Sequence, residues 1–217
     1  MITRSIDPRS VPFHVEEAYR FLKVKRDSSK FALMDRMIRD LYNRHIDAFV
    51  PRYRYKICTV SRDLSGRYSS RVDDRVTFEG EGVQRLLLGT SFVAVFLLTV
   101  GPKVDEIMSS LAGEDFTETY FFDGVASAIT IGILEVLRED LLSEAAKLRC
   151  QLGLRYSPGY AKWDLKEQEK IFTILNGREF GVTLTESHYM IPQKSLSGIF
   201  SLPSVSGTNK GSGASKG

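Results

Sequence analysis

The segment with the strongest chemical character is RYSPGYAKW, at residues 155–163. Pro158 and Gly159 suit the central positions of a type II turn, because proline fixes φ and glycine accepts a positive φ. Such a turn brings backbone close to a ligand, since Gly159 has no Cβ. Arg155 adds a planar guanidinium that suits a carboxylate. The segment is therefore either a ligand-binding loop or an ordinary loop between two helices.

Three aromatic residues of this segment fit both interpretations. Tyr156, Tyr160 and Trp163 offer faces to a planar base or to a cation. The same rings would also serve to cover a hydrophobic core. The aromatic residues alone leave the choice open.

Elsewhere the residue types form no catalytic or metal centre. His14, His45 and His188 are isolated, without the spacing of two metal ligands on one helix. The sequence has no P-loop, no GxGxxG and no GxSxG motif. Cys58 and Cys150 lack CxxC spacing and suit a reducing compartment. We predict no catalytic residue and no metal ligand, and we expect a cytoplasmic protein.

The helices and strands that must position these residues follow from hydrophobic periodicity and from Gly and Pro signals. We predict helices over 13–23, 30–49, 82–88, 102–111, 120–152 and 165–175. We predict strands over 52–60, 75–78, 91–100, 181–185, 187–191 and 195–201. The pattern is α+β, with a mostly antiparallel, twisted sheet and helices packed on one side of it. We expect one domain over 1–203, with an N-terminal helical part at 1–50 and a disordered tail at 204–217.

Charge and hydropathy argue against two classes of partner. The net charge is only +3 and the basic residues are scattered, so nucleic acid is not implied. The longest apolar run, 86–100, contains Gly89, Thr90 and Ser91, and it is too short to span a bilayer. The N-terminus MITRSIDPRS is polar, unlike a signal peptide. We therefore expect neither nucleic acid nor a membrane as partner.

A second pattern follows the first at residues 181–198, GVTLTESHYMIPQKSLSG. Alone it indicates a polar-faced strand pair that ends at Pro192. In the order RxSPGY, short helix, GxxLTES-x-x-M-x-P-x-x-SxSG, the two segments resemble the S-adenosylmethionine-binding activation domain of cobalamin-dependent methionine synthase and its stand-alone relatives. TVGPKVDE at 99–106 and FFDGVASA at 121–128 are similar to theirs as well. The resemblance extends from residue 98 to residue 200 and implies the same fold.

The resemblance implies a reactivation function. In that family, inactive cob(II)alamin returns to methylcobalamin when an external protein supplies one electron and S-adenosylmethionine donates its methyl group. The protein holds the reactants in line, so proximity and orientation are its contribution. The implied ligands and partners are S-adenosylmethionine, cobalamin carried by a partner protein, and an electron-donor protein.

The resemblance also assigns residues. Arg155 stands at the arginine expected to bind the carboxylate of the ligand. Ser157 and Gly159 stand where the family makes close backbone contacts, and Tyr160 stands at the aromatic residue expected near the reactive face of the corrin. Glu135 lies in the part of the long helix where the full-length enzyme has a glutamate close to the ligand. Without the resemblance, Glu135 belongs to a charged stripe where that helix leaves the core.

The chain departs from the family pattern on the adenosyl side of the pocket. Where the full-length enzyme continues with Pro-Ala-Cys, this chain has Ala161, Lys162 and Trp163. Where that enzyme has a paired tyrosine after its last strand, this chain has SVSG at 204–207. The resemblance therefore supports the carboxylate end of the ligand better than the adenosyl end.

Three hypotheses follow. The first is an accessory protein that reactivates a cobalamin-dependent methionine synthase in trans. The second is a corrinoid-protein-binding partner of another methyltransferase system that does not bind S-adenosylmethionine. The third is an interaction subunit that keeps the fold without a ligand.

Overall fold

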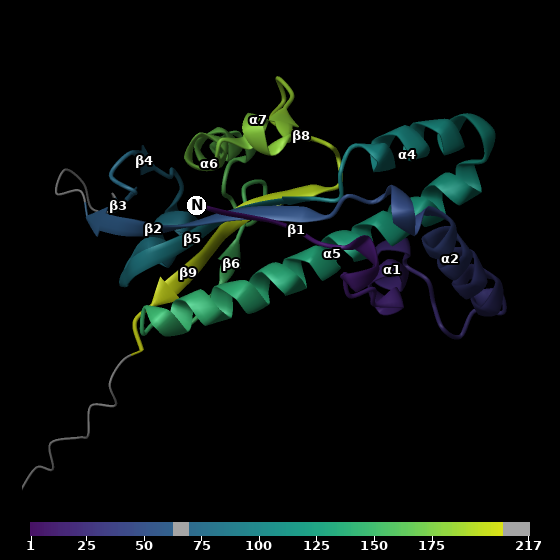
Figure 1. The fold of residues 1–217 in the computed structure, drawn as a ribbon, viewed down its shortest axis with the longest axis horizontal. Helices are drawn as coiled ribbons and strands as arrows, with labels where there is room; N and C mark the ends of the chain where they lie inside the picture. Colours follow the sequence, from purple (N-terminus) through teal and green to yellow (C-terminus); the bar gives the residue numbers. More distant parts are fainter. Residues whose placement is uncertain (63–69, 206–217) are drawn as a thin grey trace, which may run out of the picture.

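A computed structural model describes residues 1–62 and 70–205 of the chain. Residues 206–217 of the tail expected to be disordered over 204–217 lie outside the described residues, whereas Ser204 forms a β-bridge with Cys150. The described part is a sheet with helices on both faces (Figure 1). The strands are β1 (Ile2–Ser5), β2 (Arg52–Arg62), β3 (Ser70–Val72), β4 (Val76–Thr77), β5 (Thr90–Thr99), β6 (Arg155–Tyr156), β7 (Thr183–Leu184), β8 (Met190–Ile191) and β9 (Ser195–Pro203). The helices are α1 (Val15–Leu22), α2 (Phe31–His45), α3 (Glu81–Leu87), α4 (Lys103–Glu114), α5 (Phe116–Lys147), α6 (Gln168–Leu175) and α7 (Gly177–Phe180), with 3-10 turns η1 (Pro8–Ser10), η2 (Ile46–Ala48) and η3 (Leu165–Glu167).

The sheet is antiparallel, in the order β4-β3-β2-β5-β9-β6, with β1 also paired to β2. The α+β class with a mostly antiparallel sheet is thus confirmed. β7 and β8 form a separate two-stranded hairpin. β6 pairs only with Ile199 and Phe200, so the first part of β9 is left as an edge strand on that side. This open edge is where the candidate site lies.

Helices cover both faces of the sheet, so the expectation of helices on one side is wrong. Residues 93–98 of β5 have no exposed surface, although successive side chains of a strand point to opposite faces. One face packs against α1, α2 and α5, and the other packs against α3, α6 and α7. An unbroken apolar strand such as β5 is typical of a sheet that is covered on both sides.

The long helix α5 runs along one face of the sheet for much of the length of the molecule (Figure 1). It begins at residue 116, four residues before the predicted start, because the Asp115 side chain accepts hydrogen bonds from the backbone N–H groups of Thr117 and Glu118. α5 is also the one helix of the described residues that is long and apolar enough to cross a membrane, but 67% of its most apolar window is buried inside the protein. Such burial is typical of a core helix.

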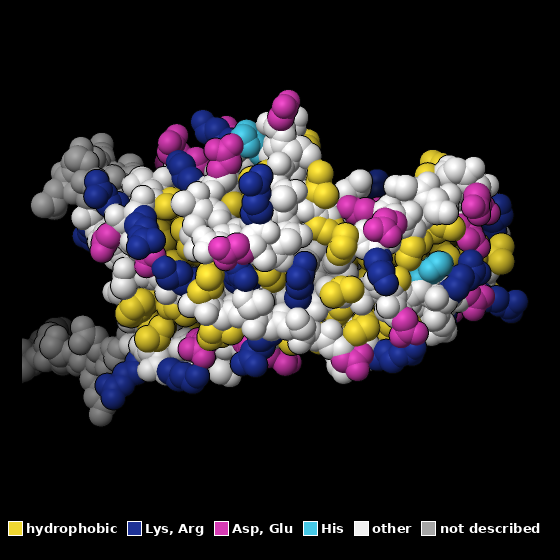
Figure 2. Space-filling model, turned by 45° about the horizontal axis from the view of Figure 1, so that its top comes forward, with side chains coloured by type: hydrophobic (Ala, Val, Ile, Leu, Met, Phe, Trp, Pro, Cys, Tyr) yellow, Lys and Arg dark blue, Asp and Glu magenta, His cyan; other side chains and the backbone are white. Residues whose placement is uncertain are grey.

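The N-terminal part, expected to be helical over 1–50, also contains a strand. β1 pairs with the first half of β2, from Ile2 opposite Tyr55 to Ser5 opposite Arg52. All four residues of β1 are exposed, so the hydrophobic periodicity that reveals a strand is missing there. On the surface, positive and negative side chains are interspersed over the face shown in Figure 2.

Candidate functional site

The loop after β6 begins with the predicted type II turn. The carbonyl of Ser157 accepts a hydrogen bond from the N–H of Tyr160 at 3.2 Å, which closes the turn around Pro158 and Gly159. Gly159 has φ +85°, the left-handed value that the second central position of this turn requires. The sequence-based prediction of this turn is confirmed.

A second turn follows at once, and no residue type in it predicts a turn. The N–H of Trp163 donates to the carbonyl of Tyr160 at 2.9 Å, and Ala161 and Lys162 have φ of 44° and 68°. Two consecutive left-handed residues usually call for Gly or Asn, and each non-glycine residue there costs about 1 kcal/mol or more. The N–H of Gly159 donates to the carbonyl of Trp163 at 2.8 Å, which joins the two turns.

Two of the three aromatic residues hold this loop instead of facing a ligand. The rings of Tyr156 and Trp163 stack with their centroids 5.3 Å apart, and Trp163 is 2% exposed. The hydroxyl of Tyr156 donates to the carbonyl of Ala161 at 2.5 Å. Tyr160 is different, because its side chain is 65% exposed. The core-covering interpretation is therefore right for Tyr156 and Trp163, and Tyr160 alone presents its ring to solvent.

The loop rests directly on β9 at Gly198. A Cβ at Gly198 would lie 2.5 Å from the carbonyl oxygen of Tyr156 and 2.6 Å from Oγ of Ser157. Any side chain there would push the loop away from the sheet. Ser157 is 5% exposed, and its hydroxyl is buried without a hydrogen-bond partner. An orphaned buried hydroxyl is uncommon in proteins and suits a polar group brought by a ligand.

Arg155 lies at the base of the loop. It makes no hydrogen bond or ion pair with residues 1–62 or 70–205, although it lines a pocket with other charged residues. Arg155 is exposed as a residue, but the surrounding protein partly desolvates its guanidinium, which lowers the pKa of Arg155, while the nearby Tyr160 acts in the opposite direction. The charge is therefore partly desolvated and available to an anion.

Two pockets flank Tyr160 along the open edge of β9. The larger, about 580 Å³, lies between the Pro158 turn and the β7–β8 hairpin, and no charged side chain lines it. The smaller, about 310 Å³, lies between α1, α5 and the start of β9, and is lined by the cationic side chains of Arg20, Arg155 and Lys194. Tyr160 lines both pockets, together with Gln193, Ser195 and Leu196. The arrangement suits a ligand with one uncharged end and one anionic end.

The segment shared by the two pockets is fixed by acidic residues of two helices. Asp105 of α4 accepts a hydrogen bond from the N–H of Gln193 at 2.9 Å. The ammonium of Lys194 contacts Asp123 at 2.7 Å and Ser127 at 2.9 Å, both on α5. Sequence reasoning assigned no function to these residues, because their partners are far away along the chain.

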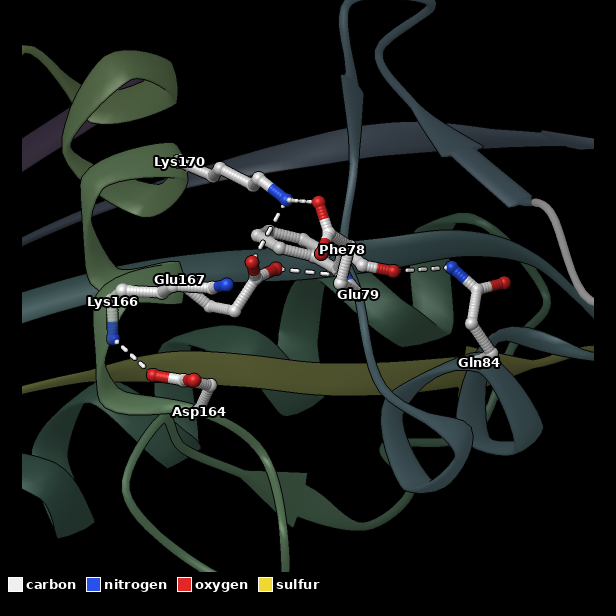
Figure 3. A network of polar contacts seen from close by, with 7 residues as sticks. All are labelled: Phe78, Glu79, Gln84, Asp164, Lys166, Glu167 and Lys170. Carbon is white, nitrogen blue, oxygen red and sulfur yellow. Dashed lines mark hydrogen bonds and ion pairs between the residues drawn. The ribbon is translucent and has the colours of Figure 1, made fainter.

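Gln168 of α6 connects two elements that line the larger pocket, β9 and the β7–β8 hairpin. Its Oε1 accepts a hydrogen bond from Ser197 at 3.0 Å, and its Nε2 donates to the carbonyl of His188 at 2.8 Å. α6 therefore holds both β9 and the hairpin. The preceding residue, Glu167, is 1% exposed and accepts hydrogen bonds from the N–H of Glu79 at 2.7 Å and from Lys170 at 2.8 Å (Figure 3).

Four of the five residues assigned from the resemblance lie together, and the fifth does not. Arg155, Ser157, Gly159 and Tyr160 belong to one loop, and all but Gly159 line the pockets. Glu135 lies on α5 beyond the pocket, where its carboxylate is 2.9 Å from Nε2 of His14. The pocket wall on α5 is instead formed about one to two turns earlier, by Ser127, Thr130 and Ile131.

The part of the chain that the structure describes contains no group of three or more His, Cys, Asp or Glu side chains that could hold a metal ion. His14 and His188 each pair with a glutamate, and His45 lies edge-on against Phe122. These contacts are structural. The two pockets on either side of Tyr160 together form one trough, which is uncharged in the larger pocket and cationic in the smaller one.

Comparisons with known proteins agree with this geometry. The family model described as vitamin B12 dependent methionine synthase, activation domain, matches residues 89–206, more than half of the chain. A crystal structure of the MetH reactivation domain bound to AdoHcy is similar over 95% of this chain and 79% of that chain, with a TM-score of 0.71 and 16% sequence identity. At that identity the likeness shows the fold alone. No curated protein sequence matches the chain.

Proposed function

Because this chain belongs to the family of vitamin B12-dependent methionine synthase activation domains, we propose that it reactivates a cobalamin-dependent methionine synthase in trans, with S-adenosylmethionine as its ligand. The cobalamin is carried by the partner, and an electron-donor protein supplies one electron. When these are bound, cob(II)alamin takes up that electron and the methyl group of S-adenosylmethionine, which leaves methylcobalamin and S-adenosylhomocysteine. This chain binds and orients the methyl donor.

The observation that carries the proposal is the trough on both sides of Tyr160. S-Adenosylmethionine has an uncharged nucleoside at one end and an amino-acid carboxylate at the other. The uncharged pocket suits the nucleoside, and in the other pocket the unpaired Arg155 provides the charge for the carboxylate of the zwitterionic amino acid. Ser157, with its orphaned hydroxyl, lies at the floor of the larger pocket.

Exposed apolar side chains around the trough suit a docking partner. Phe21, Tyr160, Tyr189 and Ile191 line the pockets and are all exposed. Large exposed apolar groups gathered at one site are typical of an interaction surface. A corrin held by its carrier protein would cover them and would also exclude water from the methyl group. A transient complex of this kind needs no large buried area, so micromolar affinity is expected.

The proposal is tested by two measurements on the purified chain. Calorimetry with S-adenosylmethionine should give a saturable heat of binding. Mixed with S-adenosylmethionine, an electron donor and a cobalamin-loaded methionine synthase that lacks its own activation domain, the chain should speed the appearance of the methylcobalamin absorption spectrum. Alone with S-adenosylmethionine it should form no methylated product.

The second hypothesis gives a different result in the same assay. A corrinoid-binding partner that does not use S-adenosylmethionine would bind the carrier protein but show no heat with the ligand. Methyl transfer by the chain alone to a small molecule would contradict the accessory role altogether.

A further inference from the structure

The larger pocket has an uncharged lining that restricts what it can bind. Its walls are apolar and aromatic, and its polar groups are hydroxyls and carboxamides. A carboxylate or phosphate placed there would lose water without gaining a counter-charge, which is costly. A flat, uncharged group with hydrogen-bonding edges, such as a purine, suits a cavity of about 580 Å³ with this lining.

Tyr189 of the β7–β8 hairpin provides a free aromatic ring at this pocket. Its backbone is fixed, because its N–H donates to Oγ1 of Thr185 at 3.1 Å and its carbonyl accepts from the N–H of Thr185 at 2.8 Å. Its side chain lines the pocket, is 65% exposed, and makes no ring contact or hydrogen bond within residues 1–62 and 70–205. An aromatic ring on a fixed backbone is a suitable platform for a base to stack on.

Gln193 provides a free carboxamide next to that ring. The two glutamines of the pocket differ, because both ends of the Gln168 carboxamide are already hydrogen-bonded within the protein. Gln193 is held by its backbone N–H on Asp105, whereas its side chain has no hydrogen-bond partner in the described part of the chain. A glutamine carboxamide carries a donor and an acceptor, which is the pair that an adenine edge requires.

We propose that Tyr189 and Gln193 bind the purine of the ligand in the larger pocket, while Arg155 holds its carboxylate in the smaller one. This inference rests on the function proposed above, and it fixes the direction in which the ligand lies. Tyr160 lines both pockets, so its ring lies beside the sulfonium between the two ends, where a cation is attracted to an aromatic face.

The experiment measures by calorimetry how tightly the whole chain binds each of three probes. S-Adenosylmethionine carries both ends, 5′-methylthioadenosine keeps the nucleoside without the amino acid, and S-methylmethionine keeps the amino acid and sulfonium without the nucleoside. Y189A should weaken the first two by about 5- to 100-fold, the usual effect of removing a base-stacking ring, and should leave the third unchanged. Y189F should bind like wild type. Arg155→Ala should show the opposite selectivity, with loss for the first and third probes only.

The outcomes distinguish a failure of the purine-pocket inference from a failure of the proposed function. Wild-type affinity of Y189A for both nucleoside probes, or a loss confined to S-methylmethionine, overturns the inference and leaves the proposed function standing. Nucleoside binding that depends on Tyr189, without any binding of S-adenosylmethionine, supports the purine pocket and overturns the proposed function. No binding of any probe overturns both. F116A is the control. It removes an exposed ring at the start of α5 that lines neither pocket, and it should bind all probes like wild type.

Discussion

Among the cationic side chains of the smaller pocket, Arg155 is the one without a partner in the described residues. Arg20 pairs with Glu17 and Lys194 pairs with Asp123, so their charges are already balanced. Partial desolvation of this exposed residue lowers the pKa of Arg155, which means that its environment disfavours the charge it carries. An anionic ligand would remove this disadvantage.

Replacing Arg155 tests that argument. Arg155→Ala should weaken S-adenosylmethionine binding by about 10- to 150-fold, since a charge-assisted hydrogen bond contributes about 1.5–3 kcal/mol. Arg155→Lys should restore only part of this loss, because lysine lacks the planar fork that binds a carboxylate with two hydrogen bonds. Calorimetry gives the affinities, and equal values for wild type and Arg155→Ala would remove the residue from the site.

Cys58 illustrates a buried group that should stay inert. It is 1% exposed on β2, and burial raises the pKa of its thiol to about 12, with the charge of Asp73 adding to the effect. The thiolate is the reactive form, so hardly any is present at neutral pH. In a Cys150→Ser variant, a thiol reagent should not label the folded protein at pH 8, but should label it fully in concentrated guanidinium chloride. Rapid labelling of the folded variant would contradict the burial of this residue.

At the scale of elements, the sequence predicts those turns whose backbone is restricted by the residue types in the turn itself. The Pro158-Gly159 turn could be predicted because both residue types restrict the backbone to it. The turn at Ala161 and Lys162 could not, since neither residue favours a left-handed conformation. It is held by the Tyr156–Trp163 stack and by hydrogen bonds, among them the one from the Tyr156 hydroxyl to the carbonyl of Ala161. The shared wall of the two pockets was missed for a related reason, as Gln193 is positioned from α4, far earlier in the chain.

Two glycines in helices give opposite predictions at this scale. A Cβ at Gly132 of α5 would lie 2.0 Å from the carbonyl oxygen of Pro12, which is backbone and cannot rotate away. Gly132→Ala should therefore lower the free energy of unfolding by about 1–3 kcal/mol or more. Gly113 of α4 has no atom within 4 Å of that position. Gly113→Ala should raise the free energy of unfolding by about 0.5–1 kcal/mol. Urea unfolding measures both, and a loss of stability in the α4 variant would contradict the open space there.

At the scale of the whole molecule, the sheet separates two hydrophobic cores. One contains α1, α2 and α5, and the other contains α3, α6, α7 and the loop with Trp163. The trough lies at the sheet edge where the two layers meet, so its walls come from both of them. The match to the family begins at residue 89. Arg20 and Phe21 of α1 also line the smaller pocket, so part of its wall lies outside the matched residues.

The pH dependence of stability should report on the core that contains α2 and α5. Burial lowers the pKa of His45, and the neighbouring Arg44 adds to this effect. The folded protein therefore binds the proton less well than the unfolded chain, whose histidine has a pKa of about 6.5. The free energy of unfolding should be highest above that pH and should fall as the pH drops through it toward the lower folded value.

Urea unfolding at pH 7.5 and pH 5 measures this effect. His45→Gln should show a smaller difference between the two values than wild type, because glutamine does not titrate. His14→Gln, at an exposed histidine, is the matched control and should behave more like wild type. An unchanged pH difference in His45→Gln would show that other groups cause it.

The stack beneath the binding loop also gives the protein an optical signal of its own. Trp163 is the chain's single tryptophan, and it lies in van der Waals contact with Tyr156 under the turn that carries Tyr160. Indole emission changes in wavelength and yield when the polarity or the packing around the ring changes. All tryptophan fluorescence of this protein therefore comes from one residue, directly behind the proposed ligand site. A ligand or carrier protein that shifts the loop can be followed in real time without a label.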